Sequence, residues 1–247
     1  MPFISTTDLT PIILTSEVDE VKELVVAAYD KDLSWLDRLH QDVTVTVYRK
    51  GDSCCHENEI VLENNVGRDV HTFFQHIESK YDKLSNITFF SQDYPFDHWE
   101  NIVEVVNGGE QACFEKAALN IDNGYFGFHY NTINTMWSMQ QSHHHAGHSI
   151  DNKNIISCDK FGNPQHINFF QSDTLDTYWS FFFDCLPPLF YEFIPGGHFA
   201  IKKSHALKRS KEFYGKVVEF LSSNKKAPWI IERFECYFFN QKYPTVI

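Results

Sequence analysis

The chain has 247 residues, with 33 acidic against 21 basic side chains and a formal net charge of −12 at pH 7. Since 43% of the residues are hydrophobic and 22% are charged, the chain can build a core, which excludes disorder as its main state. The excess of acids argues against binding to nucleic acid, because phosphate backbones attract surfaces rich in Lys and Arg. The length fits one large domain or two small ones. We expect an N-terminal arm over residues 1–20 and a single domain over residues 21–247.

No segment has the features of a targeting peptide or a membrane span. The early apolar run at residues 11–14 is too short for a signal peptide. Charged residues and prolines interrupt the aromatic stretch over residues 178–193, which excludes a bilayer span there. The six cysteines form no CxxC pair and show no regular spacing, which suggests reduced thiols. We therefore expect a cytoplasmic protein.

The first hundred residues alternate between strand and helix patterns. Residues 23–29 are a continuous apolar run, typical of a strand buried on both faces, and a short helix is expected within residues 30–39. Alternating β-branched residues predict a second strand over residues 43–48. Apolar positions three and four apart predict a helix over residues 68–81, and residues 86–90 form a third strand. This alternation predicts an α/β fold with a mostly parallel sheet flanked by helices.

The second half of the chain is less regular. Residues 105–175 include stretches rich in Asn and Gly, which predict long loops over the sheet. A strand is expected over residues 198–201, followed by a helix with Ser204 as its N-cap that continues to about residue 221. A last helix is expected over residues 229–239.

The aromatic content is unusually high, at 16% of the residues. A core packed with Phe explains this number, and composition alone favours that interpretation. The alternative is a cleft lined by rings that stack on sugars, for which Trp99, Trp137 and Trp179 are candidates.

Several familiar catalytic signatures are absent from the sequence. It contains no GxGxxG, GxxxxGK[ST], HExxH or GxSxG pattern. This argues against a dinucleotide oxidoreductase, a P-loop NTPase, a zincin and an α/β-hydrolase, so any chemistry must rest on other groups.

Arg68 is the first candidate, because it follows Gly67 where a helix is expected to begin. Free N–H groups and the helix dipole favour an anion at such a place. The guanidinium would add a bidentate phosphate contact. The alternative is an ordinary start of a helix, with Arg68 paired to an acid.

Asp93, Asp97 and His98 form the second candidate, directly after the third strand. Ligands bind at this edge of open α/β sheets. Oxygen ligands with one nitrogen suit Mg²⁺ or Mn²⁺ better than zinc. The alternative is a capped turn whose shape Pro95 fixes.

Glu232 and Arg233 form the third candidate, between Trp229 and Phe234 of the last helix. A carboxylate that faces an apolar cleft has a raised pKa and can act as a general base. The alternative, which the pair alone favours, is a solvated face.

A cluster of imidazoles is the fourth candidate. It consists of His143, His144, His145 and His148. Four imidazoles can bind zinc or nickel, but an exposed polar loop is the favoured interpretation.

Blocks of the sequence resemble the DUF3431 family in order and spacing. They are residues 25–36, 65–74, 90–98, 195–201, 213–214 and 229–233. The resemblance runs from about residue 24 to about residue 239, with a poor match between about 100 and 190. DUF3431 proteins are in turn similar to GT-A glycosyltransferases, in which a nucleotide-sugar sits at the carboxyl edge of a Rossmann-like sheet.

The resemblance implies a GT-A-like glycosyltransferase that moves a sugar from a nucleoside-diphosphate donor to a glycan or other hydroxyl acceptor. It implies donor binding by Tyr29, Asp30, Arg68, Gln92 and Arg233, a metal (Mn²⁺ or Mg²⁺) at Asp93, Asp97 and His98, and Glu232 as the catalytic base. Within the donor site, Tyr29 and Asp30 would lie near the base and ribose, and Arg68 near the diphosphate. The sequence has one acid, Asp93, where the family's Asp-x-Asp triad has two.

Two other functions remain open. One is a carbohydrate- or nucleotide-binding protein that uses the same edge without catalysis. The other is a metalloprotein built on the histidine loop. The expected partners are a nucleotide-sugar and its acceptor, with no nucleic acid and no membrane span.

Overall fold

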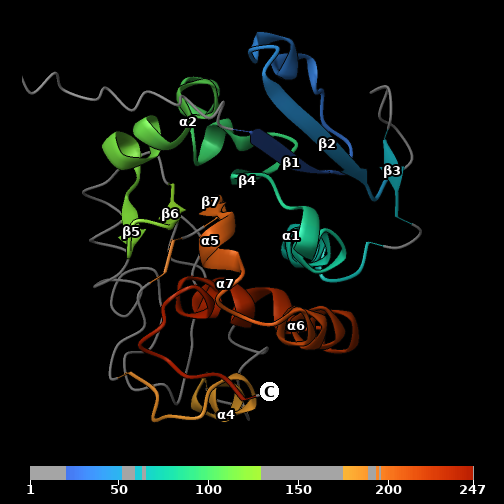
Figure 1. Ribbon diagram of the computed structural model, residues 1–247. Helices are drawn as coiled ribbons and strands as arrows, with labels where there is room; N and C mark the ends of the chain where they lie inside the picture. The colour runs from blue at the N-terminus through green and yellow to red at the C-terminus, as the bar shows by residue number, and fades with distance from the viewer. Residues whose placement is uncertain are drawn as a thin grey trace, which may run out of the picture.

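A seven-stranded sheet organises the part of the chain that the computed structural model describes, which is residues 21–51, 59–62, 65–128, 175–188, 193–194 and 196–246 (Figure 1). The strands lie in the order β3-β2-β1-β4-β7-β6-β5. Their bounds are β1 Lys22–Ala28, β2 Val43–Arg49, β3 Ile60–Val61, β4 Ile87–Gln92, β5 Leu119–Ile121, β6 Tyr125–Gly127 and β7 Phe199–Lys202. The strands expected in the first hundred residues are therefore confirmed as β1, β2 and β4.

The sheet is mixed, whereas the sequence predicted a mostly parallel one. The pairs β3–β2, β2–β1 and β1–β4 are parallel, and the pairs β4–β7, β7–β6 and β6–β5 are antiparallel. The alternation of strand and helix produces the parallel half. The other half includes a hairpin, β5–β6, whose short connection at residues 122–124 allows only antiparallel pairing.

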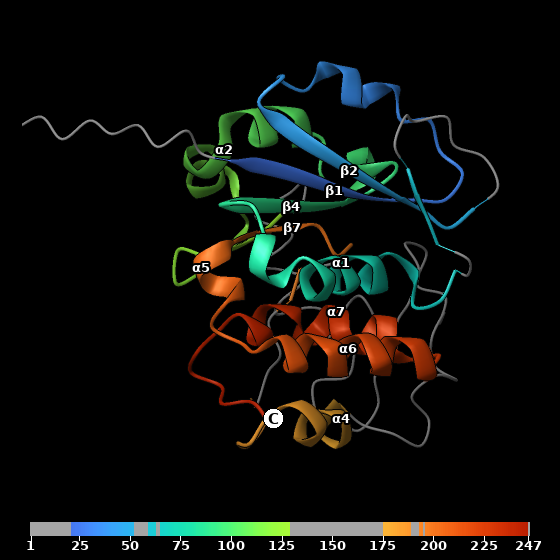
Figure 2. The same cartoon turned by 45° about the vertical axis from the view of Figure 1, so that its right-hand side comes forward.

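Helices cover both faces of the sheet in layers (Figure 2). One face carries η1 (Ser34–Arg38) and α2 (Ile102–Lys116), and the other carries α1 (Arg68–Ser79). Helices α6 (Lys211–Ser223) and α7 (Ala227–Phe238) pack beneath α1, and α4 (Leu175–Phe182) lies outermost. The short helices are η2 Tyr81–Lys83, η3 Pro95–Asp97 and α5 Lys203–Ala206.

Strand β1 is buried on both faces, as its apolar run predicted. Val25 and Ala27 face the core beneath α1, whereas Leu24, Val26 and Ala28 face the core beneath α2. Residues 24–28 of this central strand contribute to two cores and are all apolar, which explains why the sequence does not alternate there; the first two residues of the strand are charged.

The aromatic residues mostly fill these cores. Trp99 is 1% exposed and stacks on Phe128, and Trp179 is fully buried and stacks on Phe183. The suggestion that these two indoles stack on sugar rings is therefore wrong. Trp137 lies outside the described residues.

The expectation of loops from residue 105 onward is wrong for its first part, because α2 is a helix. Its buried face includes Val105, Val106 and Cys113. The helix is kinked at Gly109, whose φ of 63° and ψ of −145° are not helical. Adjacent glycines at 108 and 109 lower helix propensity, and for this reason the sequence predicted a loop here. The histidines at 143–148 lie outside the described residues.

The single helix expected to begin at Ser204 is two helices, α5 and α6. Ser204 is exposed inside α5, and the true N-cap is Ser210, whose side chain accepts a hydrogen bond from the Phe213 N–H at 3.2 Å. The last expected helix is confirmed as α7 and begins two residues earlier than predicted, at Ala227.

Two structural observations relate to the predictions of no membrane span and of reduced thiols. Among the described residues, none of the helices combines the length and the apolar character that a membrane span requires. Cys113, Cys185 and Cys236 are free thiols.

Replacing Ser210 tests the cap. Ser210→Ala should lower the free energy of unfolding by about 1 kcal/mol, because the first turn of α6 loses the acceptor of one N–H group. Ser204→Ala is the matched control and should change it little. Urea denaturation of both variants measures the difference, and equal losses would contradict the assignment.

Candidate ligand-binding site

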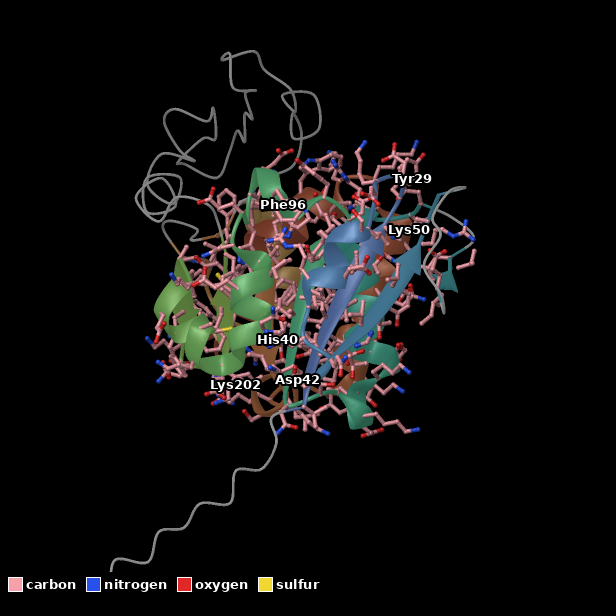
Figure 3. All side chains as sticks on the ribbon, turned by 90° about the horizontal axis from the view of Figure 1, so that it is seen from above. Tyr29, His40, Asp42, Lys50, Phe96 and Lys202 are labelled. Atoms are coloured by element: carbon pink, nitrogen blue, oxygen red, sulfur yellow. The ribbon has the colours of Figure 1, made fainter. Side chains whose placement is uncertain are left out.

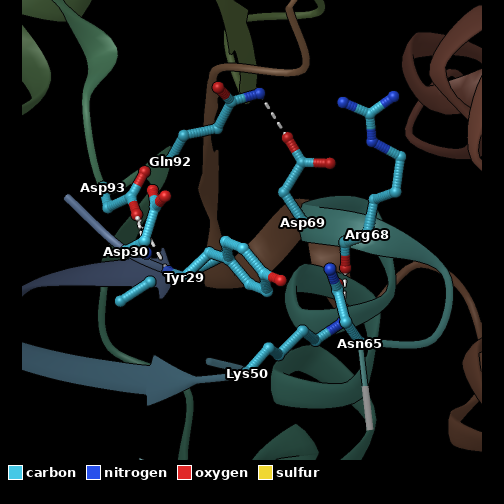
Figure 4. Close-up of a pocket in the computed structure, with 10 residues that line it drawn as sticks. Tyr29, Asp30, Lys50, Asn65, Arg68, Asp69, Gln92 and Asp93 are labelled. Carbon is cyan, nitrogen blue, oxygen red and sulfur yellow. Dashed lines mark hydrogen bonds between the residues drawn. The ribbon is translucent and has the colours of Figure 1, made fainter. Parts of the chain in front are cut away.

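A cavity of about 250 Å³ lies at the carboxyl edge of the parallel strands, where β1, β2 and β4 end (Figure 4). Its lining residues are Ala27, Ala28, Tyr29, Asp30, Lys50, Asn65, Arg68, Asp69, Gln92 and Asp93. In open α/β sheets, ligands bind in the crevice where neighbouring strands connect in opposite directions, and β1 and β4 form such a point here. Figure 3 shows Tyr29 and Lys50 at this end of the sheet and Asp42 and Lys202 at the other.

Five of the nine residues predicted for the site line this cavity. They are Tyr29, Asp30, Arg68, Gln92 and Asp93. The other four, Asp97, His98, Glu232 and Arg233, lie outside its lining.

Asp93 holds the loop that follows β1. Its Oδ2 accepts hydrogen bonds from the backbone N–H groups of Tyr29 at 2.8 Å and of Asp30 and Lys31 at 3.1 Å. Its backbone carbonyl accepts a bond from Trp35 Nε1 at 2.9 Å. Successive N–H groups that converge on one anion make a concave site, and here a carboxylate of the protein itself fills it.

The predicted metal ligands do not converge. Asp97 is exposed in η3, and the ring of His98 packs toward His198, with their centroids 5.9 Å apart. The described residues contain no group of three or more His, Cys, Asp or Glu side chains suited to a metal. Asp93, Asp97 and His98 therefore form no such group for a shared Mn²⁺ or Mg²⁺, and Oδ2 of Asp93 is already taken by three N–H bonds.

The start of α1 forms another wall of the cavity and has an unusual backbone. Gly67 and Arg68 both adopt left-handed conformations, with φ of 64° and 55°. A Cβ at position 67 would lie 2.6 Å from the His71 Cβ and 3.0 Å from the Leu221 carbonyl oxygen, so only glycine fits. Arg68 has no such freedom, and its conformation must be held by its surroundings. Its guanidinium packs over the Trp229 ring, 5.5 Å from the centroid, in a cation–π contact.

Lys50 is a member of the site that the sequence did not single out. Its Nζ donates hydrogen bonds to the carbonyls of Val66, at 2.8 Å, and of Arg68. Burial lowers the pKa of Lys50 to about 8, and the negative charge of Asp69 opposes this fall. The available signal was its position: a basic residue directly after β2 lies at the same edge as Tyr29 and Gln92.

A chain of hydrogen bonds leads from the cavity to Glu232. Gln92 Nε2 donates to the Asp69 carboxylate and, at 3.3 Å, to the Gly196 carbonyl. The Gly196 N–H donates to Glu232 Oε1 at 2.8 Å, and Glu232 Oε2 pairs with Arg233 at 3.0 Å. One residue, Gly196, therefore connects Glu232 with Gln92 of the cavity lining, and 20% of the Glu232 side chain is exposed.

Arg233 is buried rather than placed at the cavity. It donates to the Trp229 carbonyl at 2.7 Å, and its guanidinium lies 4.8 Å from the centroid of the Phe193 ring. Burial lowers its pKa, and the neighbouring Glu232 carboxylate opposes that change.

The sequence suggested a raised pKa for Glu232 of the last helix. The carboxyl group of α7 whose pKa is raised is that of Glu235. This side chain is 2% exposed and accepts a hydrogen bond from the Tyr125 hydroxyl at 2.6 Å. Burial raises the pKa of Glu235 well above its ordinary value; the Tyr125 bond lowers it, and the charges of Glu232 and Asp69 raise it further. Burial therefore favours the protonated, neutral form of Glu235.

The comparisons with known proteins bear on the family alone. The family model described as "Protein of unknown function (DUF3431)" matches residues 24–243 of the chain. No curated protein and no solved structure matches it.

Asp93 and Asp97 can be compared directly, because both were candidate metal ligands. Asp93→Ala should lower the free energy of unfolding by about 2–3 kcal/mol, since three N–H groups lose a charged acceptor. Asp97→Ala should change it by less than about 0.5 kcal/mol, because Asp97 is exposed. Urea denaturation without added metal measures both, and a small loss for Asp93→Ala would show that the loop does not depend on it.

Glu235 predicts a pH dependence of stability. Its pKa in the folded protein lies above its unfolded value of about 4.5, so the folded state retains a proton that the unfolded state has lost. Its contribution to stability is present in full below pH 4.5 and is lost as the pH rises. Relative to the wild type, Glu235→Gln should therefore be more stable at pH 8 than at pH 5.

Unfolding free energies at pH 5, 6.5 and 8 test this for wild type and variant together. Glu219→Gln, at an exposed position of α6, is the control and should show no such trend. A constant difference between Glu235→Gln and wild type would contradict the raised pKa.

Proposed function

Because the chain belongs to the DUF3431 family, whose description assigns no activity, we propose from its cavity that it is a GT-A-like glycosyltransferase. It would move a sugar from a nucleoside-diphosphate donor to a hydroxyl acceptor. The observation that carries the proposal is the cavity at the carboxyl ends of β1, β2 and β4, with Lys50 and Arg68 on one side and Tyr29 and Asp30 on another. These four residues come from three separate segments, and their types match the parts of such a donor.

The diphosphate would bind at the start of α1. Arg68 offers a planar pair of N–H donors, Lys50 adds a second positive charge, and the first N–H groups of the helix favour an anion. The ring of Tyr29, which is 51% exposed, would stack on the base, and the Asp30 carboxylate would accept bonds from ribose hydroxyls. Gln92 closes the opposite side through its bond to Asp69.

Glu232 would accept the proton of the attacking hydroxyl. A general base must lie within hydrogen-bond reach of that hydroxyl in the bound complex. Glu232 accepts a hydrogen bond from the Gly196 N–H, and the Gly196 carbonyl accepts one from Gln92 of the cavity lining. Arg233 pairs with the carboxylate and so orients it. This ion pair is the role that we propose for Arg233, in place of a direct contact with the donor.

Whether Mn²⁺ or Mg²⁺ contributes to donor binding is tested in the thermal-shift screen below. The candidate ligands Asp93, Asp97 and His98 do not fit a shared ion, and no step of the proposed reaction depends on one.

One observation favours the alternative, a nucleotide- or carbohydrate-binding protein without catalysis. Both oxygens of Glu232 already have partners, the Gly196 N–H and Arg233. In such a protein, Glu232 would fix the wall of the binding site without accepting a proton.

A thermal-shift screen decides whether the cavity binds nucleotides. UDP, GDP, CMP and their sugars are each tested with Mn²⁺, with Mg²⁺ and with a chelator. A ligand at 100 times its Kd stabilises the folded state by about 2.7 kcal/mol, which a melting curve resolves. Selective stabilisation by one nucleotide supports the proposal and identifies the donor class; no shift by any of them contradicts the transferase and a nucleotide-binding protein alike.

Glu232→Gln separates catalysis from binding. The variant should bind the donor with unchanged affinity but should hydrolyse it about 100-fold more slowly or worse, because water loses its general base. Glu219→Gln, on the exposed surface of α6, is the control and should keep the wild-type rate. Full turnover by Glu232→Gln would remove the base assignment. Donor binding without hydrolysis by the wild type would support the binding protein.

A further inference from the structure

We propose that Lys50 is a positioning residue of the diphosphate site: its ammonium group holds the left-handed turn at Gly67–Arg68 in the shape that binds the anion. Anion binding would then require Lys50 in its charged form. The inference rests on the proposed function only in taking the ligand to carry a diphosphate.

Lys50 is fixed at both ends. Its backbone N–H donates to the Ala28 carbonyl at 2.9 Å, which ties the residue to the end of β1. Its side chain extends along the cavity to the carbonyls of Val66 and Arg68, which flank Gly67 on either side (Figure 4). One side chain thus joins the ends of β1 and β2 to the first turn of α1.

The turn needs such a partner because its backbone is strained. A left-handed conformation is unfavourable for a residue with a Cβ, and Arg68 adopts it at a φ of 55°. The His71 N–H bonds to the Gly67 carbonyl at 3.1 Å, so the carbonyls of residues 66, 67 and 68 are all engaged. Two of these three bonds come from Lys50. Removing its charge weakens them, since hydrogen bonds from an ionised donor are roughly twice as strong as neutral ones.

Burial brings the protonation of Lys50 into an accessible range of pH. Among the residues that the structure describes, the ionisable groups that face it are Arg68, Asp69 and His71 of α1, Tyr29 and Asp30 after β1, and Asp93 after β4. Burial lowers the pKa of Lys50 to about 8, while the charge of Asp69 opposes the fall. Burial also lowers the pKa of His71 to about 4, so His71 stays neutral wherever Lys50 titrates.

The test measures the Kd of inorganic pyrophosphate by calorimetry between pH 7 and pH 9.5, on the full chain and two variants. If one proton with a pKa of about 8 is required, wild-type binding should weaken roughly five- to tenfold between pH 7.5 and pH 9. Lys50→Arg keeps its charge and should show no such loss. Lys50→Met should bind at least tenfold more weakly at pH 7.5 and should show no loss either.

Pyrophosphate itself titrates in this pH range, but its contribution to the pH profile is the same for the wild type and for Lys50→Arg. A difference between the two profiles therefore comes from the protein. Parallel profiles for wild type and Lys50→Arg would overturn the proposal, and so would wild-type affinity in Lys50→Met. A lysine with a merely structural role would lower the stability of Lys50→Met without separating the two pH profiles. If Lys50→Met does not fold, the profiles of wild type and Lys50→Arg decide alone.

The outcome is distinguishable from that of the proposed function. Separated pH profiles without hydrolysis of any nucleotide-sugar would support Lys50 and overturn the transferase. Hydrolysis of a nucleotide-sugar, together with the same pH profile of pyrophosphate binding in wild type and Lys50→Arg, would support the transferase and overturn the Lys50 proposal. No binding of pyrophosphate to the wild type at millimolar concentration overturns the Lys50 proposal.

Discussion

The cavity depends on one carboxylate oxygen, Oδ2 of Asp93, which accepts three consecutive backbone N–H bonds from residues 29–31. A buried charge is stable only when its hydrogen-bonding capacity is satisfied, and a loop that leaves a strand has N–H groups without partners. The carboxylate of Asp93 therefore gains hydrogen-bond donors, and the N–H groups of residues 29–31 gain an acceptor. Since Asp93 follows β4 and the loop follows β1, this contact joins the ends of two neighbouring strands and sets where Tyr29 and Asp30 stand.

The antiparallel half of the sheet brings the C-terminal part of the chain to the same edge. Because β7 runs against β4, with Phe199 opposite Phe90, the residues that precede β7 lie beside the end of β4. Gly196 can therefore accept a bond from Gln92 and donate one to Glu232. A parallel β7 would have placed Gly196 at the opposite end of the sheet. The departure from parallel pairing is thus what connects α7 with the cavity.

Sequence patterns predicted which residues lie at the carboxyl edge of the sheet better than they predicted what those residues bind. Apolar runs located β1, β2 and β4, and the residues that follow two of these strands, Tyr29, Asp30, Gln92 and Asp93, do line one cavity. The partner of each side chain was not predictable, because the bonds of Asp93 and Lys50 join residues 16 to 64 positions apart. The sequence offered Asp93 for a metal, since nothing local shows that three N–H groups occupy it. Helix α2 was missed for a local reason, its pair of glycines.

Glu232 and Glu235 show how one helix gives two carboxylates different properties. Residues three apart lie on the same face of a helix, so both side chains of α7 point toward the sheet. Glu235 meets the phenol of Tyr125 in the interior, where burial favours its neutral form. Glu232 lies nearer the edge and meets a guanidinium and a peptide N–H, partners that suit a carboxylate. Of the two, only Glu232 is linked to the residues of the cavity, through Gly196 and Gln92. This position is the reason that we propose Glu232, rather than Glu235, as the general base.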